Sequence, residues 1–222
     1  GNREIRRARI ARGNTLGGAG SPFELSAADA RLQQEHFGVA PDQILHDFVI
    51  SHVLAALEPL SDRFVFYGGT ALSRTLLNGL RLSEDIDLLS TGPRAEPARL
   101  IDSALSGLQR GLGSVSADVR LQDVTTDTAP CTYRIGEVPV RIQLISAAHY
   151  PTWPTQRSMV AQRYSGLPDL ELQTYTAEGF VAAKTVAWCD TTRNAPRDLY
   201  DLWALAERGF VTAGAANLYK EH

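Results

Sequence analysis

The chain has 222 residues, a formal net charge of −3, 44% hydrophobic residues and 21% charged residues. This balance is typical of a globular protein and argues against wholesale disorder, and no apolar run reaches the ~20 residues that a membrane-spanning helix needs. The slightly acidic charge is not that of a protein that binds nucleic acid over its whole surface. Cys131 and Cys189 form no CxxC pair and no zinc set with the scattered histidines, so we expect a reducing cytoplasm. Only Lys184 and Lys220 are lysines among 22 basic residues, which makes a lysine more informative than an arginine here.

The N-terminal residues 1–25 are predicted to form a flexible basic arm. Residues 1–13 hold five arginines and one acidic residue, and residues 13–22 are rich in glycine. Such an arm could contact nucleic-acid phosphates, and the alternative is a solvated tail without a partner. We expect a core over residues 26–168 and a helical C-terminal portion over residues 169–222 that completes the active site.

The hydrophobic pattern then predicts alternating helices and strands. Residues 41–60 carry apolar side chains at helical spacing behind Pro41, and residues 63–69 read as a strand that ends in a Gly pair. The other expected elements are a helix at 70–80, a strand at 83–90, a helix at 94–112, strands at 114–124, 131–136 and 138–146, and helices at 176–190, 195–210 and 212–220. Residues 147–168 resist assignment. The order indicates an α+β fold with a mixed sheet.

The first motif that carries chemistry is a Gly pair between a strand and a helix. Gly68 and Gly69 end the strand FVFY, and Thr70 follows them. Backbone N–H groups at a helix N-terminus attract phosphate, and glycine lets the backbone approach a ligand closely. Thr70 could add a hydroxyl donor. Many such turns are plain connections, so the Gly pair alone is weak support for a phosphate site.

A pair of carboxylates strengthens this interpretation. Asp85 and Asp87 stand two residues apart in an apolar strand, so both project from one face, roughly 6–7 Å apart at Cα. Two carboxylates this close repel each other unless a cation lies between them, and oxygen ligands at this spacing suit Mg²⁺. The alternative is that Asp87 faces solvent or caps the strand.

A second motif lies near the C-terminus. Phe180, Lys184 and Trp188 are spaced so that Lys184 shares an apolar helical stripe, and an ammonium facing a core needs an anionic partner. Asp198 and Asp201 share a face of the next helix. Either carboxylate could hold Lys184 or contact a nucleotide, and the alternative is an ion pair that merely joins two helices.

Together the two motifs resemble the polymerase-β-type nucleotidyltransferases, and in detail the AbiEii/AbiGii toxin family, which includes the MenT toxins. The similarity covers about residues 40–210. It is carried by Gly68, Gly69, Arg81, Ser83, Asp85 and Asp87, and by the later segment with Lys184, Arg197, Asp198 and Asp201. This resemblance implies a polymerase-β-like core, an NTP substrate and Mg²⁺ held by Asp85 and Asp87.

The resemblance also implies roles for the surrounding residues. Lys184, Asp198 and Asp201 would join the metal carboxylates in the catalytic set. The nucleotide would be bound by Gly68, Gly69, Thr70, Arg81 and Ser83. The superfamily usually carries a third carboxylate on a later strand, where this chain has Gln143. A site with two carboxylates can still work through positioning and charge neutralisation.

The function implied is that of a toxin in a toxin–antitoxin system. It would transfer a nucleotide from an NTP to RNA, with the tRNA 3′ end as the expected acceptor, and so block translation. Its partners would be the RNA and a cognate antitoxin, with no membrane. Two alternatives stay open: the acceptor could be a small molecule or a protein, or the chain could bind nucleotides without catalysing a reaction.

Overall fold

The computed structural model describes residues 21–124, 126, 128–150, 152–192 and 195–221. Most of the predicted basic arm therefore lies outside the described residues. Its last part is described, and there Phe23 stacks on His52 with ring centroids 5.0 Å apart. None of the helices in these ranges is long and apolar enough to cross a membrane.

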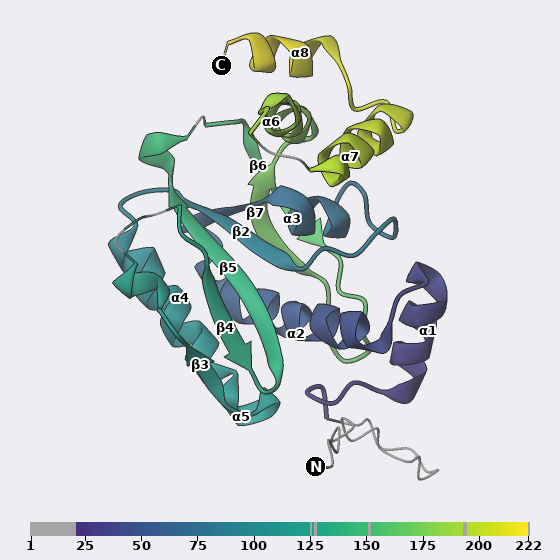
Figure 1. Ribbon diagram of the computed structural model, residues 1–222, viewed down its shortest axis with the longest axis vertical. Coiled ribbons are helices and arrows are strands. Elements are labelled where there is room, and N and C mark those ends of the chain that lie inside the picture. Colours follow the sequence, from purple (N-terminus) through teal and green to yellow (C-terminus); the bar gives the residue numbers. More distant parts are fainter. Residues whose placement is uncertain (1–20, 125, 127, 151, 193–194, 222) are drawn as a thin grey trace.

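A seven-stranded mixed sheet forms the centre of the molecule (Figure 1), in the order β3-β4-β5-β2-β1-β7-β6. Two neighbouring pairs are parallel, β1 with β7 and β2 with β5, and the other pairs are antiparallel. The strands are β1 Phe64–Tyr67, β2 Asp85–Ser90, β3 Val115–Ala117, β4 Cys131–Ile135, β5 Val138–Ser146, β6 Thr155–Val160 and β7 Leu170–Tyr175. The predicted mixed sheet is confirmed.

The helices lie around this sheet, and α6, α7 and α8 gather at one end of the molecule (Figure 1). They are α1 Ala27–Phe37, α2 Pro41–Leu57, α3 Gly68–Arg74, α4 Ala95–Gly107, α5 Gln109–Leu112, α6 Ala177–Cys189, α7 Pro196–Glu207 and α8 Ala213–Lys220. Three short 3₁₀ turns complete the described part, namely η1 Glu58–Leu60, η2 Leu121–Asp123 and η3 Ala147–His149.

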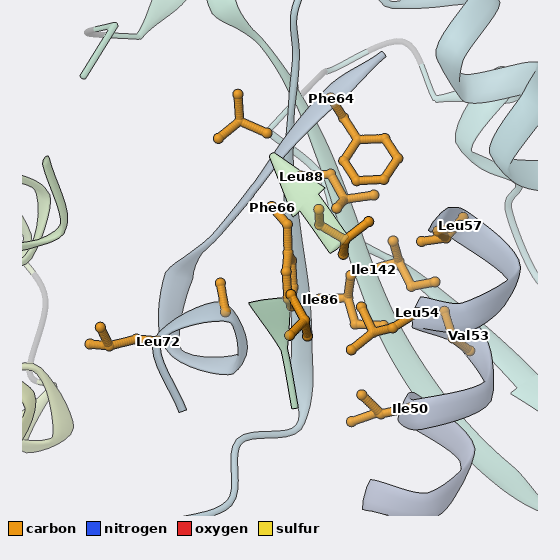
Figure 2. Close-up of a cluster of buried hydrophobic side chains, with 14 of the residues drawn as sticks. Ile50, Val53, Leu54, Leu57, Phe64, Phe66, Leu72, Ile86, Leu88 and Ile142 are labelled. Carbon is orange, nitrogen blue, oxygen red and sulfur yellow. The ribbon is translucent and has the colours of Figure 1, made fainter. Parts of the chain in front are cut away.

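The hydrophobic core lies between α2 and one face of the sheet. Figure 2 shows apolar side chains of α2 beside those of β1, β2 and β5. The alternation of each strand decides which side chains enter this core, because successive residues point to opposite faces. In β2, Ile86 and Leu88 are fully buried, whereas Asp85 and Asp87 lie on the other face and are half-buried. The core therefore fixes the direction of both carboxylates.

A buried ionic cluster anchors α3, the helix that begins at the Gly pair. The Arg74 guanidinium donates to Asp47 Oδ1 of α2 at 2.7 Å, and Arg163 donates to the same oxygen at 2.7 Å. Burial opposes the charged form of Asp47, but the two arginines and a hydrogen bond from Tyr164 outweigh it and hold the pKa of Asp47 below its usual value. The cluster ties α3 to α2 and to the segment after β6.

Several element boundaries differ from the sequence prediction. The helix expected at 70–80 ends at Arg74, and the strand expected at 114–124 is only the short β3 followed by η2. Two strands were not predicted: β6, within the unassigned stretch, and β7. Because β7 pairs with β1 inside the sheet, the helical part of the C-terminal region begins at Ala177, not at residue 169.

Candidate active site

An open cleft of about 800 Å³ lies between the sheet and the C-terminal helices. One wall comes from the ends of β1 and β7 together with β2 and β5, and the opposite wall comes from α6 and the start of α7. Of the predicted site residues, the cleft is lined by Gly68, Gly69, Asp85, Asp87, Lys184 and Asp198. The structure thus brings six residues of the two sequence motifs to one cavity.

The Gly68 backbone explains why glycine occupies this position. Its φ of +76° lies in the left-handed region that residues with a Cβ rarely adopt. A Cβ at Gly68 would also overlap the Asp87 carboxylate. The turn can therefore lie directly against the carboxylate pair only if residue 68 is glycine.

Arg81 and Ser83 support this turn from behind. A Cβ at Gly69 would come within 2.9 Å of Ser83 Oγ and 3.1 Å of Arg81 Nη2. Neither Ser83 nor Arg81 lines the cleft, and Thr70 does not line it either. Thr70 is fully buried and its hydroxyl donates to the Asp85 carbonyl, so it holds the start of β2 in place. This geometry gives the three side chains supporting positions behind the predicted nucleotide site.

Strand pairing sets the neighbours of the carboxylates. Parallel pairing of β2 with β5 places Arg141 beside Asp85 and Gln143 beside Asp87, and all four side chains line the cleft. Gln143 thus occupies the place that the sequence indicated for a third carboxylate. Its amide nitrogen donates to the Thr128 carbonyl, which ties β5 to the loop before β4. Neither Gln143 nor Arg141 adds negative charge.

Lys184 stands between two carboxylates of α7. Its Nζ lies 2.7 Å from Asp198 Oδ1 and 2.8 Å from Asp201 Oδ2. Asp201 also receives both arms of Arg81, at 2.8 Å from Nε and 2.7 Å from Nη2. The sequence left open which carboxylate would hold Lys184, and the structure pairs it with both. Because Lys184 and Asp198 also line the cleft, the pair both joins two helices and faces the cavity.

This network shifts the ionisation of Asp201. Burial opposes the charged form, but hydrogen bonds from Arg81 and Lys184 and their positive charges outweigh it, so the pKa of Asp201 lies below its usual value. Asp201 does not line the cleft. Asp201 of α7 pairs with Arg81, in the segment after α3, and with Lys184 of α6, so it joins these three parts of the chain.

The apolar stripe of α6 was predicted only in part. Phe180 and Lys184 are buried, but Trp188 is 43% exposed. The cleft-facing side of α6 instead continues through Ala183 and Ala187, at helical spacing from Phe180 and Lys184. The stripe therefore begins in the core at Phe180 and continues along the cavity.

Two further groups of residues line the cleft beside the predicted site residues. Arg141 and Arg197 add positive charge to the cavity. An aromatic wall comprises Tyr67, Trp153, Tyr175 and Phe180. Arg141 could have been found, because it lies two residues from Gln143 on the same strand face. Tyr175 could not be placed without β7.

The donor set fits a magnesium ion that a nucleotide helps to bind. Among the residues that the structure describes, no group of three His, Cys, Asp or Glu side chains could hold a metal ion. Asp85 and Asp87 supply two carboxylates, and Mg²⁺ is usually bound by one or two carboxylates together with substrate phosphates. Glycine at position 68 lets the Asp87 carboxylate lie against the start of α3, because a Cβ there would overlap the carboxylate.

Comparison with solved structures defines the class. The chain is similar to MenT4, a nucleotidyltransferase toxin from Mycobacterium tuberculosis H37Rv, with a TM-score of 0.65 and 23% identity over 86% of this chain and 68% of that chain. It is also similar to the antibiotic-resistance factor ANT(2″)-Ia, with a TM-score of 0.52 and 14% identity over 81% of this chain and 91% of the other. The fold is the polymerase-β-like α+β fold of nucleotidyltransferases, as predicted.

Sequence comparison then gives the family. The model of the nucleotidyl transferase AbiEii toxin family, assigned to type IV toxin–antitoxin systems, matches residues 52–222. The chain belongs to this family and is a nucleotidyltransferase toxin of such a system. No curated protein sequence matches it. The predicted resemblance is confirmed.

Proposed function

We propose that this toxin is a Mg²⁺-dependent enzyme that transfers a nucleotide from an NTP to RNA, with the tRNA 3′ end as the acceptor. The observation that carries the proposal is the convergence of Gly68, Asp85, Asp87 and Lys184 on one cleft of about 800 Å³. A cavity this large has room for a nucleotide and for part of an acceptor. Blocking the tRNA 3′ end would stop translation in the cytoplasm, and a cognate antitoxin would restrain the enzyme.

In this proposal, the acidic residues of the cleft would bind the metal ion, and the positively charged groups would bind the phosphates. Asp85 and Asp87 would hold Mg²⁺, which when bound would neutralise phosphate charge on the nucleotide. The backbone at Gly68 and Gly69 would receive the phosphates at the start of α3. That helix has only seven residues, so positive side chains would add to it: Lys184 together with Arg141 and Arg197.

In the proposed reaction, a hydroxyl oxygen of the acceptor attacks the α-phosphorus. The new P–O bond forms as the bond to the β-phosphate oxygen breaks, pyrophosphate leaves, and the hydroxyl proton passes to solvent. Gln143 is uncharged and cannot accept this proton as a carboxylate would. Positioning and charge neutralisation would therefore carry the catalysis, as in other phosphoryl-type transfers.

Incubation with each radiolabelled NTP, Mg²⁺ and total tRNA tests the proposal. We expect label from one NTP to appear in tRNA, and Asp85→Ala to abolish both the labelling and the toxicity in cells. Asp118→Ala is the matched control, because Asp118 is exposed and does not line the cleft. Absence of label in RNA, together with full toxicity of Asp85→Ala, would sink the proposal.

The same assay separates the alternatives. Label on an added aminoglycoside or on a polypeptide, and none on RNA, would show a different acceptor. Nucleotide binding by calorimetry without turnover on any acceptor would show a binding protein that has lost its chemistry.

A further inference from the structure

Three tyrosines are buried in the described part of the chain, and their hydroxyl groups differ. Tyr133 donates to Asp102, and Tyr164 donates to Asp47 Oδ2 at 2.9 Å. Tyr175 is only 5% exposed, yet its hydroxyl makes no hydrogen bond with any residue that the structure describes. Burial alone raises the pKa of Tyr175 above its usual value, so this phenol stays protonated and can donate.

The Tyr175 hydroxyl is also not among the described buried polar atoms that lack a partner, so it is open to solvent. Tyr175 lines the cleft, whereas Tyr133 and Tyr164 do not. Tyr133 and Tyr164 are thus bound to carboxylates of the protein, and the Tyr175 hydroxyl is available to a ligand in the cleft.

The position of Tyr175 shows which part of a ligand it meets. It is the last residue of β7, and the register of β7 with β1 places it beside Tyr67, directly before the Gly pair. Its ring lies 5.7 Å from that of Tyr67 and 5.6 Å from that of Phe180. The phosphate end of the cleft and this aromatic wall are thus neighbours.

The surroundings favour a nucleobase over a phosphate as the partner. Aromatic side chains flank Tyr175, and a flat ring with a polar edge is the part of a nucleotide that suits an aromatic wall with one hydroxyl. The phosphates have better partners in Lys184 and in the backbone at Gly68 and Gly69.

We propose that the Tyr175 hydroxyl hydrogen-bonds the polar edge of the NTP base and sets which nucleotide the enzyme prefers. This inference rests on the proposed function, since it requires a nucleotide in the cleft. A site built to hydrogen-bond one substrate group discriminates strongly against analogues that cannot pair with it. Tyr175 is then a specificity-determining residue.

The test is Tyr175→Phe, which removes the hydroxyl and keeps the ring. Calorimetry with each of the four NTPs and Mg²⁺ should show about tenfold weaker binding of the preferred NTP. The dissociation constants of the four NTPs should therefore differ less from one another than in the wild type. The melting temperature of the free variant should stay close to that of the wild type, because the hydroxyl has no hydrogen bond to the described protein that could be lost.

Tyr164→Phe is the matched control. It breaks the hydrogen bond to the buried Asp47, so its melting temperature should fall while its NTP preference stays that of the wild type. Unchanged affinity and preference in Tyr175→Phe would overturn the inference and leave the proposed function standing. A Tyr175→Phe variant in which only the choice of acceptor changes would also overturn the inference. A wild-type protein that binds none of the four NTPs would overturn the proposed function together with this inference.

Discussion

Gly68 joins a backbone constraint to a chemical one. A Gly68→Ala substitution would force an alanine into the left-handed backbone region. It would also push the new Cβ against the Asp87 carboxylate. The backbone term should cost about 1 kcal/mol of stability. Displacement of the carboxylate should reduce nucleotide transfer far more, by at least ~100-fold, because small misplacements of a reacting group carry losses of that order.

Gly209→Ala separates the two terms. Gly209 has the same φ of +76°, and its Cβ position has no neighbour within 4 Å. This control should lose similar stability in urea unfolding but keep its transfer activity. Equal loss of activity in both variants would show that backbone strain, and not the clash with Asp87, is responsible.

Lys184 gives the second prediction at the residue scale. Its ammonium fits between Asp198 and Asp201 at 2.7 and 2.8 Å while 9% of the residue stays exposed. Arginine keeps the charge but presents a longer planar fork in place of a compact point charge. Lys184→Arg should therefore lower kcat at least ~10-fold in the RNA-labelling assay, since guanidinium placement differs from that of an ammonium.

The other lysine supplies the comparison. Lys220 is exposed on α8, so Lys220→Arg should match the wild type. Lys184→Met should in addition lose about 3–5 kcal/mol in urea unfolding, because two buried carboxylates would lose a partner. A fully active Lys184→Arg enzyme would show that only the charge at this position matters.

At the scale of elements, Asp201 joins the segment after α3 to α6 and α7, and its low pKa makes this joint sensitive to acid. Since the pKa of Asp201 in the folded protein lies below the ordinary aspartate value of 3.8, the ion pairs stabilise the fold fully above that pH. Their contribution disappears as pH falls through the lower, folded pKa. The wild type should therefore lose stability steeply below about pH 4 in urea unfolding series.

Asp201→Asn tests this assignment. It should be less stable than the wild type at pH 7 and should lose less on acidification, because one of the titrating groups is gone. Asp47 still contributes an acid-sensitive share, since its pKa is lowered too. Exposed Asp62 gives the control Asp62→Asn, which should follow the wild-type curve. Identical acid profiles for Asp201→Asn and the wild type would contradict the assignment.

Elements with local signals were predictable from the sequence. The Gly pair marked the end of β1, and helical spacing behind Thr176 and Pro196 located α6 and α7. β7 was missed because its pairing partner β1 lies about a hundred residues earlier in the chain, and no local pattern records that contact. Without β7, the aromatic wall around Tyr175 could not be assembled.

The site was predictable in its membership more than in its orientations. The sequence motifs indicated Asp85, Asp87 and Lys184 as members of one site, and in the fold all three line the same cleft. Spacing could not show that Thr70 turns toward a carbonyl of β2, or that Arg81 turns toward Asp201. Those directions depend on which polar partner each buried group finds, and burial settles that only in the folded molecule.

At the scale of the whole molecule, the cleft separates two groups of candidate binding residues. Gly68, Asp85 and Asp87 belong to the sheet side, and Lys184 and Arg197 belong to the helices at the end of the molecule (Figure 1). A nucleotide that contacts both sides links parts of the chain about a hundred residues apart. Binding to the folded state alone should therefore stabilise the entire fold.

A thermal-shift series measures this linkage. With NTP and Mg²⁺ at ~100 times the Kd, the gain of about 2.7 kcal/mol should raise the wild-type Tm by roughly 5–10 °C. The double variant Asp85→Asn, Asp87→Asn should lose the Mg²⁺-dependent part of the shift, because amides replace both carboxylates and ligate the ion weakly. A shift that is equal in the variant, or independent of Mg²⁺ in the wild type, would contradict a metal-assisted nucleotide site at this pair.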